Sequence, residues 1–276
     1  MEGSNGNLLK SVVASRAVSV EPVTSGVQLG VVCPMANERD TAEAFVREVL
    51  AACHPFRFKS LTFFAVLDRV SRDGTLDLLR ELENSVPQLR VVWAPENRCV
   101  VDAYLRGYRE ALDAGCDWVL EIDAGFSHQP ADIPRFFEKM SEGFDCVFGT
   151  RFARGGGFTE SPLRRKVISR GGTLLTNLLL GTKLSDMTSG FELFTRGALG
   201  RVLDRGINSR GHFFQTEIKA HCHGLRVAEV PIRYRAASDS VNNNVLKDAF
   251  LNLWRLTRAR FSRGHAVAPL EQDEAA

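Results

Sequence analysis

The sequence predicts an α/β fold in which a mostly parallel β-sheet carries helices on both faces. Two observations lead to this prediction. Short apolar runs with the length of buried strands alternate with longer amphipathic stretches. Acidic residues follow several of these runs, at the edge where open α/β sheets bind ligands. The alternation continues from residue 27 to 235 without an internal repeat, so one main domain is expected.

The expected strands are apolar runs bounded by Gly, Pro or charged residues. They cover Val27–Cys33, Leu61–Leu67, Leu89–Trp93, Trp118–Ile122, Phe144–Phe148, Glu192–Thr195 and Arg226–Tyr234. Helices are expected between them, where apolar residues recur at helical spacing. The expected helices begin after Asn37, near Thr75, near Val101, near Ala131 and at Phe213, and a leucine-striped helix ends at Gly181.

The ends of the chain are expected to lie outside the domain 27–235. Residues 1–26 have no hydrophobic period and are expected to form a mobile leader. Residues 236–263 are expected to form a loop and an amphipathic helix, because Leu246, Ala249, Phe250, Leu253 and Trp254 follow one helical stripe. Residues 264–276 are expected to be a loose tail.

Composition excludes several classes of protein. The net charge of +2 on 276 residues gives no reason to expect a nucleic-acid partner. Six widely spaced cysteines without a C-x-x-C pair favour reduced thiols and a cytoplasmic location. No apolar run approaches the roughly 20 residues that span a bilayer. The chain is therefore expected not to cross a membrane, although a peripheral contact with a membrane surface stays open.

Three acids follow three of the expected strands. Glu38, Asp68 and Asp123 come after the first, second and fourth strands. Because parallel strands end at one edge of a sheet, we expect these carboxylates to converge on a ligand site. The alternative for Asp123 is a cap on the helix that begins near Ala131. No G-x-G-x-x-G motif follows the first strand, so a dinucleotide site is disfavoured.

A basic segment leads into the leucine-striped helix. Six basic residues and one acid lie between Arg151 and Arg170, around the glycines 155–157. The stripe itself contains Val167, Ile168, Leu174, Leu175, Leu178 and Leu179. Such a helix suits either packing against the core or binding to a membrane surface with anionic headgroups. Both interpretations stay open.

Taken together, the motifs resemble family-2 glycosyltransferases of the GT-A fold. The first group is Pro34-x-x-Asn37-Glu38, Asp68 with Ser71-x-Asp73-Gly74-Thr75, and Asp123-Ala-Gly-Phe-Ser-His128-Gln-Pro130. The second is similar to the dolichyl-phosphate mannosyltransferase type: Gly149-Thr-Arg151, Arg165-Lys-Val-Ile-Ser169-Arg170, Asp186-x-Thr-Ser-Gly-Phe191 and Glu229-Val-Pro231-Ile. The resemblance covers residues 28 to 235.

The resemblance implies an inverting enzyme that moves a hexosyl group from a nucleotide sugar, such as GDP-mannose, to a polyprenyl or dolichyl phosphate. It implies that Asp123 binds Mg²⁺ or Mn²⁺ together with the donor diphosphate. The implied donor-binding residues are Pro34, Met35, Ala36, Glu38, Leu67, Asp68, Asp123, Ala124 and Gly125. The implied residues for the acceptor phosphate are Arg151, Arg165, Ser169 and Arg170, with Asp123 and Arg151 also catalytic.

Three departures from the family pattern leave alternatives. The second acid of the Asp-x-Asp metal motif is Gly125, the pair Asp68-Arg69 replaces two acids, and a late Arg and Lys phosphate clamp is missing near 236–243. One alternative is a soluble enzyme for a small acceptor, such as a nucleoside or another specialised metabolite, with Asp186 or Glu217 as catalytic base. Another is a nucleotide-sugar-binding protein with weakened catalysis. We also predict that metal alone binds weakly and that Gly125→Asp tightens its binding.

Overall fold

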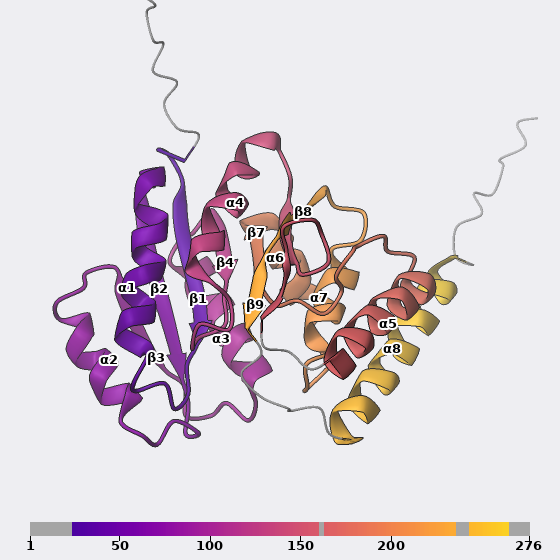
Figure 1. The fold of residues 1–276 in the computed structure, drawn as a ribbon, viewed down its shortest axis with the longest axis horizontal. Helices are drawn as coiled ribbons and strands as arrows, with labels where there is room; N and C mark the ends of the chain where they lie inside the picture. Colours follow the sequence, from indigo (N-terminus) through magenta and orange to yellow (C-terminus); the bar gives the residue numbers. More distant parts are fainter. Residues whose placement is uncertain (1–23, 160–162, 236–242, 265–276) are drawn as a thin grey trace, which may run out of the picture.

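The structure, a computed structural model, describes residues 24–159, 163–235 and 243–264. Its central strands are β1 (Gln28–Pro34), β2 (Ser60–Leu67), β3 (Leu89–Trp93), β4 (Trp118–Glu121), β5 (Cys146–Thr150), β7 (Glu192–Thr195) and β8 (Val227–Pro231). They form one seven-stranded sheet in the order β3-β2-β1-β4-β7-β5-β8 (Figure 1). All neighbours are parallel except β7, which is antiparallel to β4 and β5. The predicted mostly parallel sheet is confirmed.

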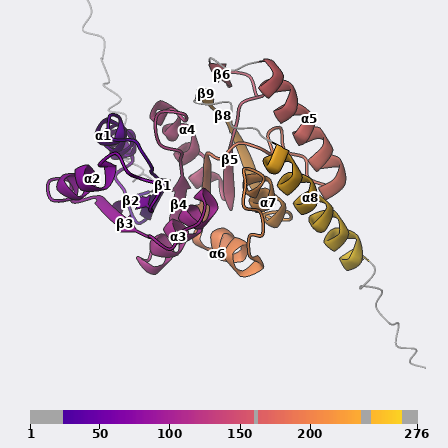
Figure 2. The same ribbon diagram turned by 90° about the horizontal axis from the view of Figure 1, so that it is seen from below.

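Helices cover both faces of the sheet, as predicted (Figure 2). The α-helices are α1 (Ala42–Cys53), α2 (Thr75–Glu83), α3 (Val100–Asp113), α4 (Ile133–Glu138), α5 (Leu163–Leu180), α6 (Arg196–Arg205), α7 (Phe214–His221) and α8 (Asn243–Gly264). Short 3₁₀ turns cover His54–Phe56, Pro130–Asp132 and Met140–Glu142. One core packs α1, α2 and α4 against the sheet around Phe45 and Phe136. The other packs α3, α6 and α7 around Tyr108 and Ile218.

Helix α3 packs closely on the sheet because Gly107 has no side chain. A Cβ on Gly107 would lie 2.4 Å from Cγ1 of Val32 in β1 and 3.0 Å from Cγ2 of Val66 in β2. Both valines are fully buried, so neither has room to move. The close contact fixes the height of α3 above β1 and β2, and with it the position of Tyr104 in the second turn.

The reversed strand β7 brings a loop back to the edge that the sequence predicts as the site. Its first residue, Glu192, lies opposite Glu121 of β4 in an antiparallel register. The residues before β7 therefore run beside the residues after β4. As a result, the loop from Asp186 to Gly190 lies next to Asp123, although the two are more than 60 residues apart in the sequence.

Helices α5 and α8 lie side by side at one end of the molecule (Figures 1 and 2). A small third core joins them to the rest of the protein through Leu180, Met187, Phe213, Leu253 and Leu256. The expected amphipathic helix near the C-terminus is thus present and longer than the stripe predicts. Among the described helices, none is both long and apolar enough to cross a membrane.

The structure differs from the predicted elements in three places. The single strand predicted over 226–234 is two strands, because β9 (Arg233–Arg235) leaves the main sheet and pairs with β6 (Gly157–Thr159). The predicted strand Phe144–Phe148 lies two residues later, as β5. Helix α6 was not predicted; Thr195 caps it by accepting from the backbone N–H of Ala198 at 3.2 Å. Most of the predicted leader, the loop 236–242 and the tail from 265 lie outside the described residues.

Candidate active site

Asp123 lies just after β4, at the carboxyl edge of the sheet. Its Oδ1 accepts a hydrogen bond from the hydroxyl of Tyr104. The side chain is 38% exposed, which leaves part of the carboxylate open to a ligand. The alternative that Asp123 caps the next helix is wrong, since the turn that begins at Pro130 has no side-chain cap.

His128 is a neutral side chain that contacts Asp123. Burial lowers the pKa of His128 to about 4, although the Asp123 carboxylate acts in the opposite direction. The 3.6 Å approach of the His128 ring to that carboxylate is therefore not an ion pair at neutral pH. Nδ1 of His128 accepts from the backbone N–H of Asp123 at 3.2 Å, which leaves the ring proton on Nε2. The ring stacks on Phe191, with centroids 5.0 Å apart.

Glu38 lies against Gly125. Its Oε2 accepts from the hydroxyl of Thr41 at 2.7 Å. The two carboxylate oxygens lie 2.8 and 2.9 Å from the position that a Cβ on Gly125 would occupy. Asp68 follows the neighbouring strand β2. Among the described residues, no Lys or Arg forms an ion pair with Glu38, Asp68 or Asp123. The three predicted acids thus share one edge without a cation from the described part of the chain.

Arg151 and Asp186 form a buried bidentate ion pair. Nε and Nη2 of Arg151 donate to the two carboxylate oxygens of Asp186 at 2.7 and 2.8 Å. Burial alone raises the pKa of Asp186, but the hydrogen bonds and charge of Arg151 outweigh it and hold that pKa below its usual value. The guanidinium also lies 4.8 Å from the centroid of Phe158. Nη1 is left without a hydrogen bond to any described residue.

A cavity of about 430 Å³ opens beside Asp123 and Arg151. These two and His128, Ser169, Ser189 and Gln215 contribute to its polar lining. Helices α5 and α8 supply an apolar wall, with Ile168, Leu175, Leu246, Phe250 and Leu253. Among the described residues that line it, Asp123 is the only acid and Arg151 the only Arg or Lys. The cavity therefore joins a polar end to an apolar wall.

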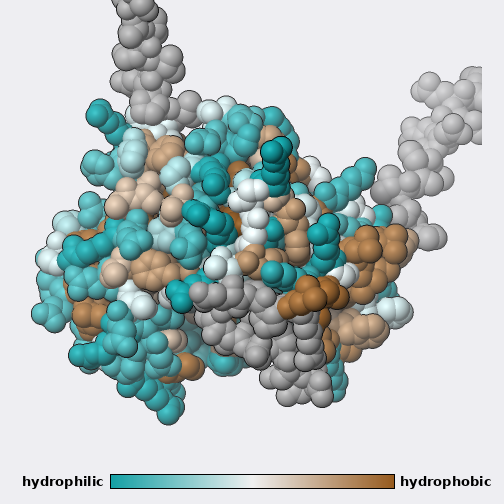
Figure 3. Space-filling model, in the orientation of Figure 1, coloured by the Kyte–Doolittle hydropathy of each residue, from teal (hydrophilic) through white to brown (hydrophobic). Residues whose placement is uncertain are grey.

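The apolar wall continues onto the outer surface of α5 and α8. Large exposed apolar side chains form what we call the α5–α8 patch: Leu163, Val167, Ile168, Leu174, Leu175, Leu178, Leu246, Phe250, Leu251, Trp254 and Phe261. Figure 3 shows apolar surface gathered at this end of the molecule. Four of these residues, Ile168, Leu175, Leu246 and Phe250, also line the cavity. The cavity and the patch are therefore one continuous apolar surface.

Beneath the polar end lies a fully buried ionic cluster. Lys219 of α7 donates to Glu192 and to the backbone carbonyl of Ser189. Gln215, one turn earlier, donates through Nε2 to Glu121. Burial and the nearby Glu192 carboxylate raise the pKa of Glu121 well above its usual value. Burial likewise raises the pKa of Glu192 to about 7, against the lowering influence of Lys219. The cluster ties β4, β7 and α7 together directly below Asp123.

The predicted acceptor residues do not all meet at the cavity. Arg151 and Ser169 line it. Arg170 is exposed, and its Cζ lies 5.5 Å from the ring centroid of Phe152. Arg165 belongs to α5, but its side chain lies outside the described residues. Two of the four predicted residues are therefore together in the structure.

Glu217 lies away from the cavity. It is fully buried, and its carboxylate accepts from the backbone N–H of Asn208 at 3.1 Å and of Ser209 at 2.9 Å. It also pairs with Arg255 of α8. These contacts fix α8 and the loop before α7, and they give Glu217 no access to a substrate. Asp186, the other predicted base, is occupied by Arg151. The hypothesis that either residue serves as a base has no support in their positions.

The remaining donor residues lie at the ends of β1, β2 and β4. Pro34 is the last residue of β1, and Ala36 follows it on the exposed surface. Met35 and Leu67 are 2% and 0% exposed, so neither side chain is available to a ligand. Ala124 packs partly against the same core. None of these five residues lines the cavity.

Sequence reasoning missed four residues that line the cavity next to Asp123. They are Tyr104, His128, Ser189 and Gln215. His128 and Ser189 lie inside motifs that carry the resemblance, so the motifs themselves were the available signal. Tyr104 occupies an apolar position of a helix, and its hydroxyl gives no signal until α3 is packed on the sheet.

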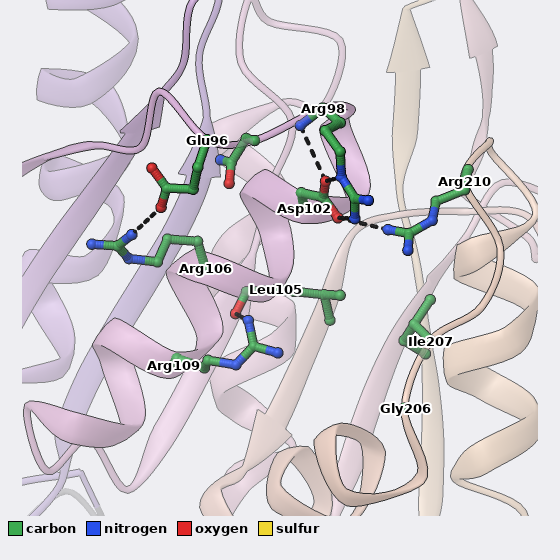
Figure 4. Close-up of a pocket in the computed structure, with 10 residues that line it drawn as sticks. Glu96, Arg98, Asp102, Leu105, Arg106, Arg109, Gly206, Ile207 and Arg210 are labelled. Atoms are coloured by element: carbon green, nitrogen blue, oxygen red, sulfur yellow. Dashed lines mark hydrogen bonds and ion pairs between the residues drawn. The ribbon is translucent and has the colours of Figure 1, made fainter.

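A second pocket, of about 590 Å³, lies on the other side of α3 (Figure 4). There Asp102 accepts from Arg98 and from Arg210, and Arg106 donates to Glu96 at 2.7 Å. Four arginines and two acids line this pocket, so its lining carries a net positive charge. The pocket contains none of the predicted site residues.

The comparison with protein families agrees with the geometry. Residues 30–203 match the model described as glycosyl transferase family 2. An undecaprenyl-phosphate mannosyltransferase of Micrococcus luteus is 31% identical over 195 residues, which is 69% of this chain and 80% of that protein. A polyprenol monophosphomannose synthase of Mycolicibacterium smegmatis is 30% identical over 207 residues, 74% of this chain and 76% of that protein.

Solved structures share the fold at lower identity. Glucosyl-3-phosphoglycerate synthase of Mycobacterium tuberculosis, in complex with Mn²⁺, UDP-glucose and phosphoglyceric acid, superposes with a TM-score of 0.59 at 17% identity. The match covers 87% of this chain and 82% of that one. The complex of the same enzyme with Mg²⁺ and UDP gives 0.59 at 18% identity, with 87% and 81% covered. The chain belongs to glycosyl transferase family 2, as an enzyme with the GT-A fold.

Proposed function

We propose that this glycosyltransferase moves a mannosyl group from a nucleotide sugar to a polyprenyl phosphate, with inversion at the anomeric carbon. The observation that carries the proposal is the shape of the cavity. Its polar end holds Arg151 and Ser169, and its apolar wall runs out to the α5–α8 patch. A polyprenyl phosphate has the same two parts, an anionic head and a long hydrocarbon chain. The names of the two bacterial relatives support the same substrate class.

The acids around the cavity favour a phosphate acceptor over a hydroxyl acceptor. A phosphate is already an anion and attacks without a base, whereas a hydroxyl group usually needs a carboxylate within hydrogen-bond reach. Asp123 is the only acid among the described lining residues. Asp186 and Glu217 are both held in other contacts. A single displacement, which inverts the sugar, also fits a cavity whose described lining holds no carboxylate besides Asp123 to act as a nucleophile.

Each polar residue then has a role. Arg151, oriented by Asp186, offers its remaining guanidinium donors to the acceptor phosphate, and Ser169 adds a hydroxyl group. Tyr104 and His128 hold Asp123 at the junction of cavity and sheet edge. Asp123 therefore lies between the acceptor and the donor residues on β1 and β2.

The donor diphosphate is proposed to bind with a divalent metal ion. No cluster of three or more metal-ligating side chains occurs in the described part of the chain. Two carboxylates are enough, however, because Mg²⁺ in such sites usually takes one or two of them and fills its shell with phosphates and waters. Asp123 and Glu38 fit this need. The ion would neutralise the charge that develops on the leaving diphosphate.

The α5–α8 patch is proposed to lie on a membrane. Trp254 and Phe250 of α8 are 62% and 71% exposed, and Leu178 of α5 is 75% exposed. Arg258 and Lys247 of α8 are exposed too, which suits anionic headgroups. A patch in this position would bring the mouth of the cavity to the bilayer in which a polyprenyl phosphate resides.

The test offers the purified protein labelled nucleotide sugars with vesicles that contain polyprenyl phosphate, and separately with a pool of soluble acceptors. We expect label in the lipid fraction, with a mannose donor best. Asp123→Ala should lower the rate on the order of 10²–10³-fold. Label on a soluble product only would overturn the lipid acceptor, and no transfer with any donor would favour a binding protein with weakened catalysis.

A further inference from the structure

Two buried polar atoms next to Asp123 lack a hydrogen-bond partner among the described residues. They are Oγ of Ser189 and Oε1 of Gln215. The residues are 2% and 5% exposed, and both line the cavity. A buried polar atom without a partner lowers the stability of a protein, so proteins contain few of them. Two such atoms in one cavity point to a ligand that satisfies them.

The backbone places these residues beside Asp123. In the register of β4 and β7, Glu121 lies opposite Glu192. Extending that register by two residues brings Gly190 opposite Asp123, with Ser189 next to it. A Cβ on Gly190 would lie 2.5 Å from Nε2 of Gln215. Because residue 190 is a glycine, there is room beside it for the side-chain amide of Gln215.

The buried cluster below fixes the orientation of both residues. Nε2 of Gln215 donates to Glu121, which turns Oε1 away from that carboxyl group. Lys219 donates to the backbone carbonyl of Ser189 and so holds the loop that carries the hydroxyl. The hydrogen bonds of the buried cluster therefore hold both residues in place.

The hydrogen-bonding chemistry of the pair selects one class of ligand group. Oε1 of an amide only accepts, so its partner must donate, and the oxygens of an ionised phosphate cannot. A hydrocarbon chain would leave both atoms unsatisfied. The hydroxyl of Ser189 both donates and accepts. A hydroxyl group on a ligand also donates and accepts, so hydroxyl groups can satisfy both atoms, and the transferred sugar carries several.

We propose that Ser189 and Gln215 form the subsite for a hydroxyl group of the transferred sugar, and that this subsite sets the donor sugar that the enzyme accepts. The inference rests on the proposed function, because it takes the ligand beside Asp123 to be the sugar of the donor. A subsite built to bond a hydroxyl group discriminates strongly against a sugar that lacks it, since its own buried atoms are then left unpaired.

The test compares the variants Ser189→Ala and Gln215→Met with the wild-type enzyme on a panel of donors that each lack one sugar hydroxyl. For the wild type, one deoxy donor should lose on the order of 10²-fold or more in kcat/KM. Each variant should lose about tenfold on the parent donor and almost nothing further on that deoxy donor. Binding of the nucleoside diphosphate without sugar, measured by calorimetry, should stay within about twofold of the wild type.

Thr176→Val provides the matched control. Thr176 lines the same cavity, but its hydroxyl already donates to the backbone carbonyl of Gly172 at 2.8 Å. This variant should keep the wild-type ratio between parent and deoxy donors. If a variant loses binding of the nucleoside diphosphate, Ser189→Cys, which keeps the volume and hydrogen-bonds weakly, replaces it in the comparison.

The outcomes separate this proposal from the proposed function. Variants that discriminate against every deoxy donor as the wild type does would overturn the subsite and leave the enzyme activity in place. A different pair of results would overturn the acceptor and keep the subsite. In that case the wild-type enzyme transfers no sugar to polyprenyl phosphate, while Ser189→Ala binds the sugar nucleotide more weakly and the nucleoside diphosphate as well as the wild type does.

Discussion

The carboxylate of Glu38 lies in the space that a side chain on Gly125 would enter. Its oxygens are 2.8 and 2.9 Å from the Cβ position of Gly125. A Cβ does not approach an oxygen this closely, so Glu38 and a side chain at position 125 cannot both occupy this space. We expect Glu38, on the β1–α1 loop, to take the place of the acid missing after β4.

This geometry reverses the prediction made from sequence for Gly125→Asp. A Cβ at position 125 would clash with the Glu38 carboxylate and force it to shift, so Mn²⁺ should bind more weakly in the presence of nucleoside diphosphate. Glu38→Ala should weaken Mn²⁺ binding about tenfold, roughly the loss of one ligand interaction. The double variant should recover most of the affinity, since Asp tolerates the positive φ of 68° at this position.

Calorimetric titration of Mn²⁺ into the four proteins, with nucleoside diphosphate present, checks this cycle. Additive losses in the double variant would show that Glu38 and an acid at 125 do not occupy one place. Tighter binding in Gly125→Asp with Glu38 intact would refute the interpretation outright.

Asp186→Asn should destabilise the protein and disorder Arg151. Removing one member of a buried ion pair leaves the other uncompensated and costs about 3–5 kcal/mol. The pKa of Asp186 is lowered in the folded state, so its stabilising contribution is present above the unfolded pKa and is lost as pH falls through the folded one. Chemical denaturation at pH 7 and in acid measures both effects. The variant should lose less stability than the wild type on acidification, and equal acid sensitivity would count against the pair.

Glu121→Gln should flatten the dependence of stability on pH. Because burial raises the pKa of Glu121, the folded state keeps its proton while the unfolded state ionises. Stability due to this group is therefore complete below the unfolded pKa and falls as pH rises toward the folded pKa, by up to about 1.4 kcal/mol per pH unit. Denaturation curves from pH 5 to 8 should show a smaller slope in Glu121→Gln. Burial raises the pKa of Glu192 to about 7, so this group adds its own fall in stability up to about pH 7 in both proteins.

Trp254→Glu and Leu178→Glu should reduce binding to anionic vesicles. Both side chains belong to the α5–α8 patch, and neither lines the cavity. A charge there opposes insertion among lipid headgroups. Vesicle sedimentation measures the effect, while transfer to a short, water-soluble polyprenyl phosphate should persist. Val70→Glu is the control, because Val70 is 60% exposed at a distant loop and should leave vesicle binding unchanged. Equal losses in all three variants would contradict a membrane-binding role for the patch.

The sequence predicted the fold well because its strands are buried on both faces. The run from Leu29 to Cys33 has no polar residue, and Glu38, Asp68 and Asp123 follow their strands as parallel topology requires. The same reasoning failed at 226–234, where the strand leaves the main sheet. Periodicity gave no sign of that break.

The site was harder to predict because it depends on packing between distant segments. Glu217 looks like a catalytic acid on a helix, but it faces Arg255 and the loop at Ser209. Ser189 comes close to Asp123 because the antiparallel β7 returns to this edge, and Gln215 reaches the same cavity from α7. Neither the missing partner of a buried atom nor the space beside Gly190 can be read from residue types alone.

The shared wall of cavity and patch has a kinetic consequence. Ile168, Leu175, Leu246 and Phe250 belong to both. With the patch on a membrane, as proposed, an isoprenoid chain moving between bilayer and cavity would pass along apolar side chains instead of through water. For an enzyme seated in this way, turnover would follow the mole fraction of acceptor in the lipid plane rather than its concentration in bulk solution. Diluting the acceptor with inert lipid at a fixed total amount would then slow the reaction.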